Sequence, residues 1–190
     1  MGSVVLDVGP THEPITVADA KLHLNIETTD DDIYITSLIT AARQYVENFL
    51  QRTIITQTWS YYLDAFLREM VLPQPKLISV SAITYVDTGG TTQTLSSSIY
   101  QVDNFKEPAR VVLAYGQSWP TTRSQINAVR IQYVAGYGAD TQVPETIKQA
   151  IKIMIGHWFE NREPVIVGTS VMPMPMSAES LLLPYLAHRF

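Results

Sequence analysis

Two long segments of the chain carry apolar residues at three- and four-residue spacing. The stronger pattern covers residues 30–51, and a similar one covers residues 144–162, between Pro144 and Pro164. Such spacing gathers apolar side chains on one face of an α-helix. In the second helix, Pro144 is compatible with the first turn and Pro164 ends the helix. The two stripes are Ile35, Leu38, Ile39, Ala42, Val46, Phe49 and Leu50, and Ile147, Ile151, Met154, Ile155 and Trp158.

A shorter helix is predicted over residues 17–24. Thr16 and Asp19 have the spacing of a capping box, in which each side chain accepts from the other residue's backbone N–H. In the long helix that follows, Arg43, Gln44 and Glu47 fall off the apolar stripe, on the polar side. The two long helices are expected to pack together, because each has a single apolar face.

The segment from residue 54 to 137 changes to the two-residue alternation of β-strands. It is rich in Thr, Val, Ile, Tyr and Trp, and turn-forming residues divide it into about six short strands. Within each of three strands, larger apolar residues are expected to share one face of that strand. They are Trp59, Tyr61 and Leu63 in one strand, Val111, Leu113 and Tyr115 in another, and Val129, Ile131, Tyr133 and Ala135 in a third.

The predicted fold class is therefore α+β. Three main helices form a small bundle, and an antiparallel sheet or sandwich at about residues 54–137 is inserted between the second and third. We expect residues 1–163 to form a single domain and residues 164–190 to form an extended C-terminal docking tail.

Composition removes several functional classes. The chain has 190 residues, a net charge of −5 and no run of basic residues, which argues against a nucleic-acid-binding surface. It has no cysteine, so disulfides, cysteine-rich zinc sites and thiol nucleophiles are excluded. No apolar run approaches the roughly 18 residues of a membrane span, and the N-terminus lacks the pattern of a signal peptide.

The stretch GHWFENRE, residues 156–163, is the most suggestive for chemistry. His157 and Glu160 lie three apart and can touch on a helix, but no third group nearby completes a catalytic set. Trp158 continues the apolar stripe, which favours a buried helix end over an active site. The four histidines lack metal-ligand spacing, and neither a complete nucleotide loop nor a nucleophile elbow occurs. We therefore predict no catalytic residues, no metal and no cofactor.

The last 27 residues are apolar although prolines interrupt them. Disordered tails are usually polar and charged, so this segment is expected either to pack on its own domain or to dock on a neighbouring subunit or partner. The residues predicted to bind a partner are Val171, Met172, Met174, Met176, Leu181, Leu182, Leu183, Tyr185, Leu186 and Phe190.

The order and spacing of these segments resemble the head–tail connector (adaptor) proteins of tailed bacteriophages and prophages, in the longer subfamily with a β-rich insertion. The resemblance covers about residues 14–163. It is carried by PITVADAKLHLNIETTDDDIYITSLITAARQYVENFLQRT, QTWSYYLDAF, LPQPKLISVSAITYVDTGG, SIYQVD, RVVLAYGQSWPTTR and VRIQYVAGYGADTQVPETIKQAIKIMIGHWFENRE, with a weaker likeness in LLLPYLAHRF.

The resemblance implies a non-enzymatic virion protein that assembles in the bacterial host cytoplasm and resides at the neck. Such proteins form a ring, expected to contain twelve copies, under the portal protein. The ring extends the DNA channel without sequence-specific binding and docks the next neck or tail-completion protein. Two alternatives stay open: a small hydrolase using His157 and Glu160, and an unrelated soluble binding module.

Overall fold

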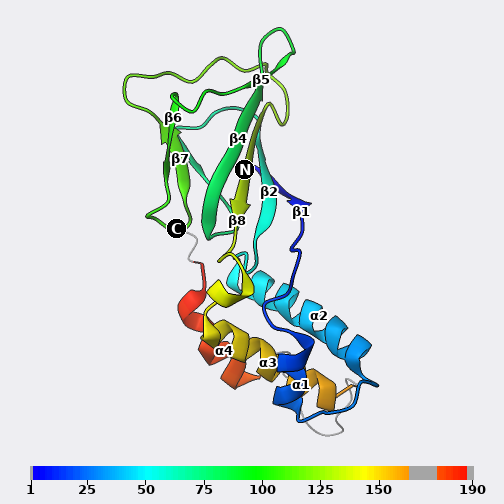
Figure 1. Cartoon of the computed structure of the whole chain (residues 1–190). Coiled ribbons are helices and arrows are strands. Elements are labelled where there is room, and N and C mark those ends of the chain that lie inside the picture. The colour runs from blue at the N-terminus through cyan, green and yellow to red at the C-terminus, as the bar shows by residue number, and fades with distance from the viewer. Residues whose placement is uncertain (1, 163–174, 188–190) are drawn as a thin grey trace, which may run out of the picture.

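The computed structural model describes residues 2–162 and 175–187, and it is an elongated molecule with helices at one end and strands at the other (Figure 1). The helices are α1 (Val17–Leu24), α2 (Asp32–Leu50), α3 (Glu145–Glu160) and α4 (Met176–Leu182), with 3-10 turns η1 (Asp140–Gln142) and η2 (Leu183–Tyr185). The strands are β1 (Ser3–Val8), β2 (Gln57–Leu63), β3 (Glu69–Val71), β4 (Leu77–Val86), β5 (Thr92–Thr94), β6 (Tyr100–Asp103), β7 (Arg110–Leu113) and β8 (Val129–Ala135). The predicted α+β class is confirmed.

The three predicted helices are confirmed, and their boundaries move by at most two residues. The capping box at the start of α1 is present, since the Asp19 N–H donates to Thr16 Oγ1 at 3.1 Å and the Thr16 N–H donates to Asp19 Oδ2 at 3.0 Å. The apolar stripes of α2 and α3 pack against each other, with Ile39 and Ile151 almost wholly buried. Helical periodicity therefore located this core correctly.

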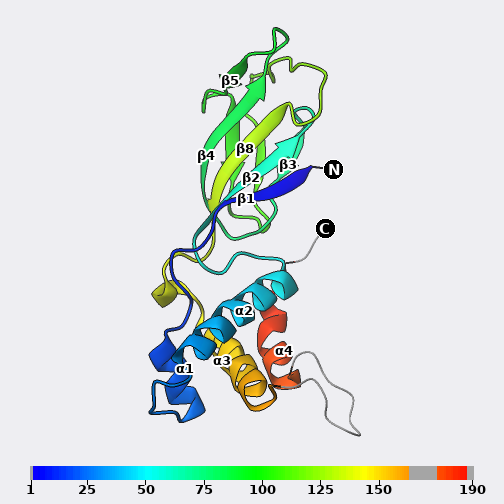
Figure 2. The same ribbon diagram turned by 90° about the vertical axis from the view of Figure 1, so that its right-hand side faces the viewer.

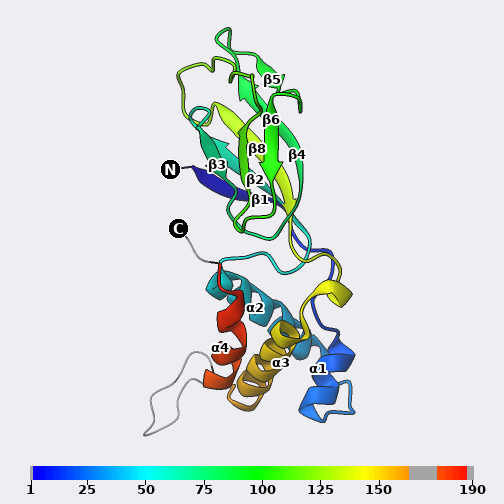
Figure 3. The same cartoon turned by 90° about the vertical axis from the view of Figure 1, so that its left-hand side faces the viewer.

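The strands form two antiparallel sheets that face each other. The larger sheet has the order β1-β2-β8-β4-β5, and the smaller has the order β3-β7-β6. Figure 3 shows the smaller sheet lying over the larger one. The inner faces enclose a second apolar core, which includes Ile131 and Tyr133 from β8 and Val111 from β7. The predicted alternation is confirmed along β8. On β2, Leu63 is buried and Trp59 and Tyr61 pack partly buried against this core, but Ser60 on the opposite face is also buried.

Two predictions about the strands need correction. Strand β1 was not predicted, and it adds residues 3–8 to the sheet although they lie outside the predicted β-rich segment. It is an edge strand with little burial, so the alternation that marks half-buried strands is absent. Tyr115 was expected to share a strand face with Val111, but β7 ends at Leu113 and Tyr115 is fully exposed.

The extended conformation predicted for the C-terminal tail is wrong for residues 176–185. Seven of these residues form α4 and the next three form η2, and α4 packs on α3 beside α2 (Figure 2). Pro175 and Pro184 flank α4, where a proline does not interrupt the helix interior. Ala178 and Leu182 are fully buried in the helical core, so α4 completes that core.

None of the helices within the described residues is long and apolar enough to span a bilayer.

The contact between α2 and α3 predicts a large effect at its centre. Ile151→Ala should lower the free energy of unfolding by about 2–5 kcal/mol, because it leaves a cavity in a closed core. The matched control is Ile33→Ala, since Ile33 is 88% exposed on α2, and its effect should stay within about 0.5 kcal/mol. Urea denaturation measures both, and equal midpoints for the two variants would contradict this core.

Candidate functional site

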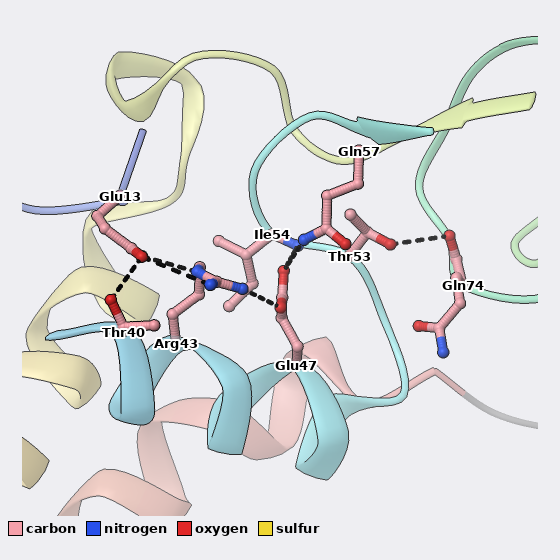
Figure 4. Close-up of polar contacts among 8 residues, drawn as sticks. All are labelled: Glu13, Thr40, Arg43, Glu47, Thr53, Ile54, Gln57 and Gln74. Atoms are coloured by element: carbon pink, nitrogen blue, oxygen red, sulfur yellow. Dashed lines mark hydrogen bonds and ion pairs between the residues drawn. The ribbon is translucent and has the colours of Figure 1, made fainter. Parts of the chain in front are cut away.

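A buried polar cluster lies where the helical and β-rich parts of the molecule meet (Figure 4). Arg43, on α2, is only 5% exposed. Its Nε donates to Glu13 Oε2 at 2.7 Å, and one of its terminal nitrogens donates to Glu47 Oε2 at 2.7 Å. Thr40 donates to Glu13 from one turn earlier on the same helix. Arg43 therefore joins α2 to the segment that connects β1 with α1.

Glu47 extends the cluster from α2 to the residues at the start of β2. Its Oε1 accepts from the Ile54 N–H at 3.0 Å and from Gln57 Nε2 at 2.7 Å. Burial raises the pKa of Glu47, although the Ile54 N–H and the charge of Arg43 act in the opposite direction. The carboxylate thus links α2 to the start of β2, and its side chain is only 14% exposed to solvent.

The sequence pattern placed Arg43 and Glu47 on the polar face of α2, and this interpretation missed that Arg43 is buried and that Glu47 is largely covered. The face is covered because the residues that precede α1 and those that follow α2 both cross it. Their four-residue spacing, with opposite charges, is the one sequence signal that could have suggested a pair. Such pairs are common on exposed helices, so the signal alone does not indicate a buried junction.

A cavity of about 210 Å³ lies beside this cluster, lined by residues that include Arg43, Glu47, Arg52 and Trp59. Arg52 is 7% exposed; it donates to Tyr137 Oη at 2.9 Å and to Glu107 Oε2 at 2.8 Å. Its Nε and the indole Nε1 of Trp59 are buried and have no hydrogen-bond partner among the described residues. Each is a donor that a water molecule or an acceptor from another molecule can satisfy.

Aromatic side chains of the GHWFENRE stretch, at the end of α3, pack against α2. Phe159 packs against Tyr34 with ring centroids 5.9 Å apart, and Trp158 makes an edge contact with Tyr45 at 6.0 Å. The Arg162 guanidinium lies over the rings of Tyr34 and Phe159, at 4.6 and 4.8 Å from their centroids. The stretch is thus a packed helix end, as the position of Trp158 on the apolar stripe suggested.

Arg162 also forms an ion pair with Asp31 at 3.0 Å. Because Asp31 is the N-cap of α2, this pair adds a polar link between the end of α3 and the start of α2. Neither the His157 nor the Glu160 side chain forms a hydrogen bond or ion pair with any residue in the described ranges 2–162 and 175–187. The backbone carbonyl of His157 accepts from Asn161. The arrangement gives the catalytic alternative no support.

Acidic and histidine side chains do not gather into a cation site in the part of the chain that the structure describes: no group of three or more is close enough to hold a metal ion.

The residues predicted to bind a partner fall into three groups. Val171, Met172, Met174 and Phe190 lie outside the described residues. Leu182 is fully buried in the helical core, so it is not available to a partner. Met176 and Leu183 are 70% and 52% exposed, whereas Leu181, Tyr185 and Leu186 are half-buried.

Comparison with known proteins identifies one matching family and solved structures with a similar fold. A family model described as head completion protein (HCP) matches residues 13–174. A search of curated proteins finds no match.

Three solved structures share the fold over nearly the full length of both chains. A chain in the neck of an empty GTA particle with C6 symmetry has a TM-score of 0.78 and 21% identity, covering 100% of this chain and 97% of that one. A chain in the virion of a native gene transfer agent (GTA) particle has a TM-score of 0.78 and 20% identity, covering 98% and 96%. A chain in the neck of a native GTA particle with C12 symmetry has a TM-score of 0.74 and 22% identity, covering 100% and 97%.

The junction cluster predicts a measurable loss of stability when its carboxylate is removed. Glu47→Ala deprives the Ile54 N–H, Gln57 and the buried Arg43 of an acceptor, so the free energy of unfolding should fall by about 1–3 kcal/mol. Glu160→Ala is the matched control, because Glu160 is an exposed glutamate on α3, and its effect should stay within about 0.5 kcal/mol. Thermal and urea unfolding measure the difference, and a Glu47→Ala variant as stable as the control would show that the cluster is dispensable.

Proposed function

The chain belongs to the head completion protein family, and from this premise we propose that it is a structural head–tail connector of a tailed phage or prophage particle. The observation that carries the proposal is the family match, which spans residues 13–174 and so includes most of both the helical and the β-rich parts. The similar fold of chains from GTA necks supports a place at the neck, between head and tail.

In this proposal the protein forms a ring of twelve copies under the portal protein. The C12 symmetry of the neck with the similar chain supports that number. The ring extends the channel through which packaged DNA passes and docks the next neck or tail-completion protein. A net charge of −5 suits a channel protein that lets DNA slide, because phosphate-binding surfaces need clustered Lys and Arg.

A ring contact or portal contact of this kind needs apolar area that a folded monomer leaves exposed. The exposed side chains Met176 and Leu183 lie on the segment that begins with α4 and provide such area. Leu181, Tyr185 and Leu186 add half-buried area beside them. This segment, from α4 onward, is therefore a docking element for a neighbouring subunit or for the portal, while Leu182 anchors it to its own core.

A genetic complementation test addresses the proposed function directly. In the phage or prophage that encodes the chain, its deletion should leave heads without tails, and the wild-type gene should restore tailed particles. A His157→Ala/Glu160→Ala variant should restore them to the same extent, because no chemical step is involved. Electron microscopy counts the tailed fraction, and a folded double variant that fails to restore tails would favour the hydrolase.

The docking role of the α4 segment predicts a loss of assembly without a loss of fold. Met176→Glu with Leu183→Lys should leave the circular dichroism melt unchanged, since both side chains are exposed and the new charges suit the two ends of the helix. The yield of tailed particles should fall at least about tenfold, because burying one such side chain is worth about 1.5–3 kcal/mol.

The matched control is Leu22→Lys, which changes an 84% exposed leucine on α1. It should leave the yield of tailed particles unchanged. Equal yields from the control and the double variant would mean that the α4 segment packs only on its own domain.

A further inference from the structure

The larger sheet has two open edges, one on each side. Strand β1 pairs only with β2, so its outer edge has no strand partner within the described residues. At the other side, β5 pairs with Thr84–Val86 of β4, and Leu95 bonds to Ile83 just before it. Among the described residues, 77–82 of β4 have no strand partner on that side, so they present a second open backbone edge.

Neither open edge carries the charges that usually protect one. Exposed edges are commonly blunted by lysine, proline, inward-pointing charges or β-bulges. Both edges do contain register shifts, between Leu6 and Val8 on β1, and between Leu77 and Ser79 and between Val80 and Ala82 on β4. Strand β1 has the sequence SVVLDV and the open part of β4 is LISVSA. The one charge, Asp7, is occupied within its own sheet: its carboxylate accepts from Ser60 Oγ at 2.6 Å and from Arg130 and Gln132 at 2.8 Å each.

Both edges instead expose apolar side chains. On β1, Val5, Leu6 and Val8 are 48%, 45% and 55% exposed. On β4, Ile78 is 45% exposed, and it lines a groove of about 400 Å³ between the open part of β4 and β6. The apolar side chains exposed on β1 thus have a counterpart on the other side of the molecule, in a groove of mixed polar and apolar lining that includes Ile78, Val80 and Val102.

The strand directions allow these two edges to meet. Strand β1 is antiparallel to β2, β2 to β8, and β8 to β4, so β1 runs antiparallel to β4. A rotation about an axis roughly parallel to the strands keeps their directions. It can bring β1 of one copy beside the open edge of β4 in the next, where the new pair is antiparallel like every other pair in the sheet. Each open edge is six residues long.

We propose that β1 of one copy adds to the open edge of β4, residues 77–82, in the neighbouring copy, so that the sheet continues from subunit to subunit. The inference rests on the proposed ring, because a contact between two different surfaces of one chain closes into a ring when it repeats by rotation. Backbone hydrogen bonds supply the pairing. Burial of Val8 and Ile78 excludes water from the contact.

The absence of cysteine from the chain makes this contact easy to test. A Val8→Cys/Ile78→Cys variant is treated in purified particles with a short bismaleimide, which bridges thiols that are a residue or two out of register. Within one copy, β1 and β4 are separated by two strands, about 14 Å at about 4.8 Å per strand spacing, so links should form mainly between copies. We expect a ladder of covalent dimers, trimers and larger multimers on a denaturing gel.

Two controls separate this contact from random collision. Each single-cysteine variant can form dimers only. The pair Val8→Cys/Ile126→Cys replaces the groove residue with one in the loop before β8 that is 79% exposed, and it should form no ladder. Particles that contain the Val8→Cys/Ile78→Cys chain but give no ladder would overturn the strand contact and leave the proposed ring intact. Particles that never contain the chain would overturn the proposed function itself.

A charge substitution provides a second measurement that does not depend on cross-linking. Ile78→Lys should reduce the yield of tailed particles at least about tenfold, because it places an unpaired charge in the groove, whereas Ile126→Lys should not change it. Equal yields from the two folded variants would overturn the contact. They would indicate that the bulges of β1 and β4 serve only to protect these edges.

Discussion

The side chain of Glu47, only 14% exposed, lies at the junction of two parts that each have their own apolar core. The architecture depends on how its charge is satisfied. The carboxylate is paired with Arg43 and also accepts from Ile54 and Gln57. Removing an ion from water is costly unless its partners surround it. The chain must therefore bring α2, the segment before α1 and the start of β2 to one point, which restricts how the two parts can be oriented.

This restriction bears on the proposed assembly. The exposed residues at the α4 segment belong to the helical part, whereas the open edges of β1 and β4 belong to the β-rich part. A ring whose subunits dock through one part and pair through the other needs both surfaces in a defined relation. The polar cluster supplies that relation through hydrogen bonds of fixed direction, which apolar packing alone does not provide.

The parts of the fold that depend on local periodicity could be predicted from the sequence. The stripes of α2 and α3 and the alternation along β8 follow from which residues must be buried, and the structure confirms them. Strand β1 and helix α4 depend on long-range partners. Strand β1 pairs with β2, and its Asp7 accepts from Ser60 and Arg130. Helix α4 packs on α3 and places Ala178 and Leu182 in the helical core. The burial of Arg43 follows from segments far away in sequence, so no local pattern indicates it. The family resemblance, by contrast, is carried by segment order and is confirmed by the family match.

The number of copies per particle decides whether this chain is a stoichiometric structural component of the neck. Quantitative mass spectrometry of purified, DNA-filled, tailed particles, with an isotope-labelled standard of this chain and of the portal protein, gives that number. Twelve copies per particle are expected, in agreement with the C12 symmetry of the neck that contains the similar chain. Particles that carry full tails but contain no copy, or only one, would contradict this structural role.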